Sequence, residues 1–343
     1  MSLLKSFVVA ACLAGSTLAS AHAETVIRFS NWLPPTHPIT TDILQPWAAN
    51  IAKATEGRVK VQFLPALGKP PAHFDLVRDG VADAAMSVHA YTADRFPTAY
   101  GMTLPGYADN ATSGSVAYWR TYKKHFEKLD EFKGVKLVGL WTHGPGHIYT
   151  RNKPVTKIED LSGLRLRATG GIVQDISTRL GIVPQFASAS EAYELLSRGV
   201  VDGVMFNSDS VYSFKMNNIL NNAYRIPGGL YRDTHYVIIN PKTYAGLSEA
   251  DRAAFDKESG EALARLAGHA WDKVENDAWT KMKAAGYTIN VADAAAVAKI
   301  GAEGDELKKA WLERVGKLGI DGNAALAYYR EQIAEVDKEE SKK

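Results

Sequence analysis

Apolar residues recur along this chain with two different spacings, and the clearest alternation between them runs from residue 160 to residue 215. Short apolar runs bounded by glycine are typical of strands, and the stretches of helical spacing between them are typical of crossover helices. The expected order is strand, helix, strand, helix, strand, over residues 164–168, 172–180, 182–186, 188–198 and 200–206. This order predicts an α/β fold with a parallel sheet, in which a ligand lies beyond the carboxyl ends of the strands.

The rest of the chain continues this alternation on both sides. Further strands are expected at residues 25–30, 58–64, 135–141, 236–240 and 287–291, and long helices at 40–55, 112–126 and 248–285. Residues 74–86 also align without gaps on residues 193–205, with Leu, Gly, Val, Asp and Met coinciding. Either two similar helix-to-strand turns share one sheet, or two lobes of like build each deliver a loop to a common cleft.

The composition is that of a globular protein with room for two cores. The chain has 343 residues, of which 46% are hydrophobic and 23% are charged, which is long enough for two domains. Its formal net charge of +2 is too small to indicate a nucleic-acid partner, so we expect none.

Residues 1–23 have the layout of a secretory signal peptide. A positively charged start, a short apolar core and the motif Ala21-His22-Ala23 predict cleavage before Glu24. Cys12, the single cysteine, lies inside the apolar core, and lipid attachment there is the alternative to simple removal. The mature chain would then lack disulfides and thiolate sites. No later segment offers an uninterrupted apolar span of membrane length.

A cation, an aromatic ring and an amide stand where neighbouring strands end. Arg167 ends one strand, and Phe206 and Asn207 end another. A guanidinium group can hold a carboxylate through two parallel hydrogen bonds. The alternatives are a structural salt bridge for Arg167 and local backbone hydrogen bonding for Asn207.

Two blocks of this stretch also carry a family resemblance. GLRLR, ending at Arg167, and RGVVDGVMFNSDSVYSFK, ending at Lys215, resemble the solute-binding subunits of TRAP (tripartite ATP-independent periplasmic) transporters. The resemblance covers essentially the whole mature chain. It implies a two-lobe periplasmic binding protein fold, with a cleft between the lobes and a long helix bridging them. It also implies that Arg167 grips the acid group of the ligand, whereas Arg165, where the motif usually has lysine, has no ligand role.

The resemblance suggests how the chain is divided. Residues 24–147 with 236–285 would form the first lobe, and residues 148–235 with 286–337 the second lobe. Residues 338–343 would be a frayed, charged tail.

Six further residues are candidates for the cleft wall: His147, His143, Trp32, His89, Tyr91 and Tyr231. Some relatives carry a second arginine near position 147, so a histidine there could donate to the same anion, more strongly when protonated. For each histidine the alternative is a structural role, and for the aromatic residues it is ordinary core packing. If they do face the cleft, the ligand has a flat or apolar body, or is a quaternary ammonium held by cation–π contacts.

The implied function is periplasmic capture of a small organic anion, such as an aromatic, hydroxy or keto acid. The captured anion would pass to one small and one large integral membrane subunit, with uptake driven by a sodium gradient. We expect a monomer that catalyses nothing and needs no cofactor or metal. The sequence has no HExxH, P-loop, G-x-S-x-G or dinucleotide motif.

Two kinds of alternative remain open. The chain could serve another transport or sensor system and bind a small sulfonate or a quaternary ammonium, which its gene neighbourhood would reveal. It could also be a secreted hydrolase with a histidine-centred site, which a turnover assay would reveal.

Overall fold

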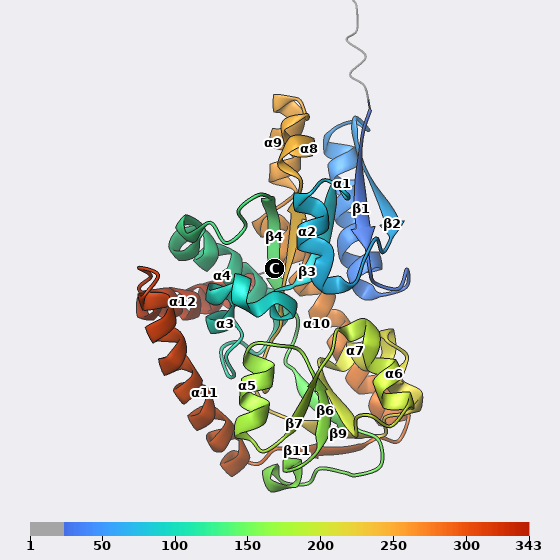
Figure 1. Ribbon diagram of the computed structural model, residues 1–343, viewed down its shortest axis with the longest axis vertical. Helices are drawn as coiled ribbons and strands as arrows, with labels where there is room; N and C mark the ends of the chain where they lie inside the picture. Colours follow the sequence, from blue (N-terminus) through green and yellow to red (C-terminus); the bar gives the residue numbers. More distant parts are fainter. Residues whose placement is uncertain (1–23, 343) are drawn as a thin grey trace, which may run out of the picture.

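The computed structural model describes residues 24–342 and contains two β-sheets, each covered by helices. Figure 1 shows the sheets in two lobes, one above the other, with helix α10 (Glu261–Ala284) passing from one to the other and α11 (Ala294–Gly316) along one side. The predicted signal segment, including Cys12, lies outside the described residues. Within the described range, no helix combines the length and apolarity needed to cross a membrane.

The first sheet has five strands in the order β2-β1-β3-β10-β4. β1 pairs in parallel with β2 and β3, whereas β10 runs antiparallel to β3 and β4. The strands are β1 (Thr25–Asn31), β2 (Val59–Pro65), β3 (Ala84–Val88), β4 (Lys136–Thr142) and β10 (Thr234–Ile239). β1, β2, β4 and β10 lie within a few residues of the predicted positions.

The second sheet has six strands in the order β11-β9-β5-β8-β6-β7. β6 pairs in parallel with β7 and β8, as the alternation of strands and helices predicted. The strands are β5 (His147–Thr150), β6 (Arg165–Ala168), β7 (Val183–Phe186), β8 (Gly203–Phe206), β9 (Asn222–Arg225) and β11 (Thr288–Val291). The two segments with matching sequences end in β3 and β8, which belong to different sheets, so they are corresponding turns of two lobes.

Helices cover both sheets and link them. Their bounds are Gln45–Ala54 (α1, preceded by a π-helical turn over Ile39–Leu44), His73–Arg78 (α2), Pro97–Met102 (α3), Ala111–Thr121 (α4), Ile172–Arg179 (α5), Ala192–Ser197 (α6), Ser208–Ser213 (α7), Pro241–Ala245 (α8), Glu249–Lys257 (α9) and Gly322–Glu340 (α12), besides α10 and α11. The mixed α/β architecture predicted from the sequence is therefore confirmed.

The prediction of a single helix over residues 248–285 is wrong in one respect, because the helix is broken at Gly260. This residue has a φ of +59°, which strongly favours glycine. Its N–H donates to the carbonyl of Val138 at 2.8 Å, and a Cβ here would stand 2.7 Å from the ring of Trp119. The break turns the chain against the first sheet before α10 begins.

Two carboxylates on α10 tie this helix to both lobes. Asp272 accepts hydrogen bonds from the N–H groups of Ala111 (2.6 Å) and Thr112 (3.0 Å), at the start of α4 in the first lobe. Glu275 accepts one from the N–H of Ser208 (2.8 Å), at the start of α7 in the second lobe. Both contacts supply acceptors to helix N-termini, whose first N–H groups have no partner within the helix. Helix α10 is therefore the bridging element that the family resemblance implied.

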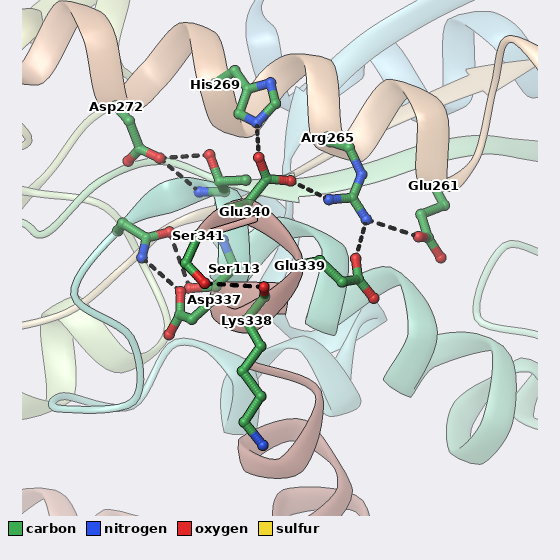
Figure 2. A network of polar contacts seen from close by, with 12 residues as sticks. Ser113, Glu261, Arg265, His269, Asp272, Asp337, Lys338, Glu339, Glu340 and Ser341 are labelled. Atoms are coloured by element: carbon green, nitrogen blue, oxygen red, sulfur yellow. Dashed lines mark hydrogen bonds and ion pairs between the residues drawn. The ribbon is translucent and has the colours of Figure 1, made fainter. Parts of the chain in front are cut away.

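The last part of the chain is shared between the lobes. Strand β11 pairs with β9 in the second sheet, α11 contacts both α5 and α3, and α12 packs on α4 of the first lobe. The predicted division instead gave all of residues 286–337 to the second lobe. The segment expected to be a frayed tail instead contains the last turn of α12. Glu339 and Glu340 of this turn pair with Arg265 of α10 (Figure 2).

Candidate ligand-binding site between the lobes

A pocket lies between the two lobes, and its wall includes Trp271 of α10. A cleft between two domains is a usual place for a small-molecule site. Six of the residues predicted for the cleft line it: Arg167, Asn207, Phe206, His143, Trp32 and Tyr91. His37 lines it as well, and the structure adds residues that the sequence did not single out for the cleft: Thr169, Asp233, His235 and Trp271.

Arg167 is the cation of this cavity, and it is fully buried on β6. Its Nε donates to the carbonyl of Ala187 at 3.0 Å, and Nη1 lies 3.5 Å from the carbonyl of Met205. The guanidinium carbon is 4.1 Å from the ring centroid of Phe206. Nη2 has no hydrogen-bond partner in the described structure. A buried cation held only by neutral groups is costly, which makes Arg167 a candidate for binding an anion.

Asn207 takes part in a buried network that ends on α10. Its Nδ2 donates to Glu275, and its Oδ1 accepts from the hydroxyl of Ser210 at 2.7 Å. Ser208 donates to the same Glu275 carboxylate from its hydroxyl. Burial raises the pKa of Glu275, and these hydrogen bonds partly oppose that rise. Both ends of the Asn207 amide are thus engaged, but by the side chains of Glu275 and Ser210 and not by the local backbone groups that the alternative reading named.

His143 lines the cavity with both ring nitrogens engaged by the backbone. Its Nε2 accepts from the N–H of Asp233 at 3.0 Å, while Nδ1 faces the carbonyl of Gly144. This pattern assigns the proton to Nδ1 in a neutral ring. The imidazole therefore orients the loop between β4 and β5 and offers the cavity no ring N–H.

Trp32 and Tyr91 form an aromatic corner of the cavity, with ring centroids 6.1 Å apart. The indole N–H of Trp32 donates to the carbonyl of Met86 at 2.9 Å, so this residue presents ring surface to the cavity. The hydroxyl of Tyr91 accepts from the N–H of Ala189 at 2.9 Å. Because Tyr91 belongs to the first lobe and Ala189 to the second, this hydrogen bond joins the lobes directly.

Three predicted site residues lie elsewhere. His147 lines a separate cavity beside Trp279, accepts from the N–H of Ile226 at 3.2 Å, and has its pKa lowered to about 3, chiefly by burial. His89 packs against the rings of Phe96 and Tyr236 in the first lobe, where burial lowers its pKa to about 3. Tyr231 packs its ring against Gly146.

The residues missed by sequence reasoning left little signal. Glu275 is one acidic residue among several on α10, and Trp271 fits the apolar stripe of that helix. His235 is the second residue of β10, whose start was predicted two residues too late. Only the tertiary fold brings these positions to one wall. Within residues 24–342, no group of three or more His, Cys, Asp or Glu side chains is placed to hold a metal ion.

Comparison with known proteins connects this geometry to a family. Residues 29–313 match the family model DctP, described as bacterial extracellular solute-binding protein, family 7. A curated relative, the outer membrane transporter protein TsaT of Comamonas testosteroni, is 31% identical and covers 97% of this chain and 99% of its own. The C4-dicarboxylate-binding periplasmic protein DctP of Rhodobacter capsulatus is 32% identical over 46% of each chain.

Solved structures agree with these matches. A TRAP periplasmic solute-binding protein from Bordetella bronchiseptica, with bound mandelate, is 43% identical with a TM-score of 0.89, covering 91% of this chain and 99% of its own. A TRAP solute-binding protein from Rhodoferax ferrireducens, in complex with benzoate, is 27% identical with a TM-score of 0.86, covering 92% and 99%. The expected family and two-lobe fold are therefore confirmed: this chain belongs to family 7 of the bacterial extracellular solute-binding proteins, the family of TRAP solute-binding proteins.

Proposed function

We propose that this protein captures a small aromatic monocarboxylate in the periplasm and delivers it to the membrane subunits of a TRAP transporter. The observation that carries the proposal is Arg167, a fully buried guanidinium group whose Nη2 has no partner among the described residues. A carboxylate oxygen on Nη2 would neutralise the charge and supply the missing acceptor. Charge-assisted hydrogen bonds of this type are stronger than neutral ones.

The surroundings of Arg167 favour an aromatic acid. Phe206, Phe214, Trp32 and Tyr91 line the same cavity, and ring stacking there suits a flat ligand body. The related proteins of known structure contain mandelate and benzoate, and another is specific for aromatic acids. The buried Asp233 also lines the cavity. A dicarboxylate would therefore find no free cation there for its second carboxylate.

Lobe closure then converts binding into a signal for the membrane subunits. The ligand would fill the space between β6 of the second lobe and β10 of the first, while the Tyr91–Ala189 hydrogen bond closes over it. Excluding water strengthens the ion pair with Arg167. The binding protein itself performs no chemistry in this scheme, and its partners recognise the closed form.

The test is a thermal-shift screen of the mature protein against benzoate, mandelate, 3-hydroxybenzoate, succinate and choline, followed by calorimetry. An acid present at about 100 times its Kd adds roughly 2.7 kcal/mol of stability. We expect this shift from aromatic monocarboxylates and not from succinate or choline. A shift from choline or succinate alone would overturn the proposal.

A further inference from the structure

The cavity holds a second polar site, separate from Arg167, on the wall formed by the first lobe and α10. His235 of β10 and Trp271 of α10 both line the cavity, and their ring centroids lie 6.2 Å apart. His235 Nδ1 and Trp271 Nε1 are buried and have no hydrogen-bond partner within residues 24–342. Both residues are more than nine-tenths buried. Buried nitrogens of this kind cost stability unless something pairs with them.

An aromatic wall connects this second site to the first. Arg167 lies over Phe206, whose ring centroid is 6.0 Å from that of Phe214. Phe214 lies 4.9 Å from His37, which in turn lies 6.3 Å from Trp271. A flat ligand body lying along these rings would have one end at the guanidinium group of the second lobe. Its other end would face the two unpaired nitrogens of the first.

The chemistry of the second site selects an uncharged oxygen. The indole N–H of Trp271 is a donor only, so it requires an acceptor. His235 stacks on Trp141 with parallel rings 5.6 Å apart and has no carboxylate partner in the described structure. Asp233, which accepts from the hydroxyl of Thr169 at 3.0 Å, also lines the cavity. A second carboxylate on the ligand would add a negative charge to a cavity that Asp233 already lines, whereas a hydroxyl or keto oxygen would add none.

We propose that the ligand is an aromatic acid carrying a hydroxyl or keto oxygen, which accepts a hydrogen bond from Trp271 Nε1 and pairs with His235 Nδ1. A hydroxyl suits the site best, because it can accept from Trp271 and also donate to an unprotonated Nδ1. This inference rests on the proposed function, since it assumes that Arg167 holds the carboxylate. It adds that the first lobe reads a second group of the same molecule, so a ligand with both groups bridges the closed lobes.

An unsubstituted acid would leave both nitrogens unpaired in a closed cavity. Losing one hydrogen bond of this type corresponds to about a tenfold change in affinity. Sites built to bind a ligand hydroxyl reject analogues that lack it more strongly than apolar pockets reject an extra one. We therefore expect at least one hydroxylated acid to bind about tenfold more tightly than its parent.

The test is calorimetric titration of matched acids: benzoate against its 2-, 3- and 4-hydroxy derivatives, and phenylacetate against mandelate. The same titrations are done with Trp271→Phe and His235→Phe, which keep a ring and remove the nitrogen. Trp279→Phe, on the same helix but lining another cavity, is the matched control. We expect both site variants to reduce the hydroxyl preference of the wild type several-fold, and the control to keep it.

The outcomes separate this inference from the proposed function. Tight binding of the parent acids with no preference for any hydroxylated partner overturns the second site and leaves the carboxylate site intact. A preference that survives both site variants also overturns it. Failure of every acid to bind overturns the proposed function and this inference with it. Since the wild-type ligand comparison needs no variant, poor folding of Trp271→Phe would not prevent a decision.

Discussion

Two regions of this protein contain arginine in opposite electrostatic surroundings. At the C-terminus, Arg265 pairs with Glu261 at 3.2 Å, with Glu339 at 2.7 Å and with Glu340 (Figure 2). Between the lobes, Arg167 is fully buried without any carboxylate partner in the described structure. The cluster in Figure 2 is complete in itself and fixes the end of α12. The Arg167 guanidinium group instead keeps one nitrogen without a hydrogen-bond partner among the described residues, a local exception of the kind expected at functional sites.

The carboxylates of the two regions differ in the same sense. In the C-terminal cluster, a hydrogen bond from Arg120 lowers the pKa of Glu261, and one from Arg265 lowers that of Glu339. Behind the cavity, burial raises the pKa of Glu275 and brings that of Asp209 to about 7. Ion pairs that lower carboxyl pKa values are therefore found in the C-terminal cluster, whereas buried carboxyl groups with raised pKa values are found beside the cavity.

The largest expected effect comes from replacing Arg167 by Met. This removes the anion's partner but keeps a chain that can lie along Phe206, so aromatic acids should bind at least about 100-fold more weakly. The unliganded protein should keep its stability to within about 1 kcal/mol, because a buried charge without a counterion is removed along with its two backbone hydrogen bonds. Calorimetry with benzoate or mandelate and urea unfolding measure the two quantities. Undiminished binding would show that the anion is held elsewhere.

The second prediction concerns Asp209, whose hydroxyl partner Ser213 donates to it at 2.7 Å. Its pKa is raised from 3.8 to about 7 in the folded protein by burial, so the folded state holds the proton more tightly than the unfolded state. This contribution to stability is fully present below pH 3.8 and is lost as the pH rises through 7. Asp209→Asn should therefore gain about 2 to 3 kcal/mol relative to wild type between pH 5 and pH 7, since each pKa unit corresponds to about 1.36 kcal/mol.

Urea unfolding at several pH values tests this sign. Asp277→Asn, at an exposed position on α10, is the matched control and should follow the wild-type profile. An Asp209→Asn difference that stays constant with pH would mean that the carboxyl titrates alike in both states. The carboxylates of the C-terminal cluster should act oppositely, because their lowered pKa values contribute stability that is lost on acidification.

The same contrast shows what could be predicted from the sequence. Local spacing of apolar residues was sufficient for the strands around Arg167, and position at a strand end was sufficient to select Arg167, Phe206 and Asn207. The sequence does not reveal that Glu275 reaches Asn207, or that Trp271 and His235 share a wall, because these pairs are 68 and 36 residues apart in the chain. His147 was selected because some relatives carry an arginine near this position, yet the register of β5 directs it to another cavity.

The third prediction moves to the C-terminal cluster. Arg265→Met leaves Glu339 and Glu340 without this cation, and we expect a loss of about 1 to 2 kcal/mol, more than for an isolated surface pair because several charges form a network. The loss should shrink at high salt, since these side chains are partly exposed. Ligand affinity should not change. Urea unfolding at two salt concentrations and calorimetry measure these effects, and Arg198→Met, from an exposed pair with Glu194, is the control for the loss of a single ion pair.

The smallest effect is expected at Arg165, and its comparison with Arg167→Met tests why that substitution has the largest effect. Arg165 stands two residues before Arg167 on β6, is about half exposed, and bonds to Asp202 through two nitrogens at 2.7 Å and 3.1 Å. Arg165→Met removes the same charge from the same strand, but from a satisfied surface pair, and such pairs contribute little to stability. We expect unchanged affinity for aromatic acids and a correspondingly small change in the midpoint of urea unfolding. A substantial loss of affinity would mean that the ligand responds to the overall positive field of β6. Retained affinity, set beside the loss in Arg167→Met, would assign the anion to the guanidinium group of Arg167, whose Nη2 has no partner among the described residues.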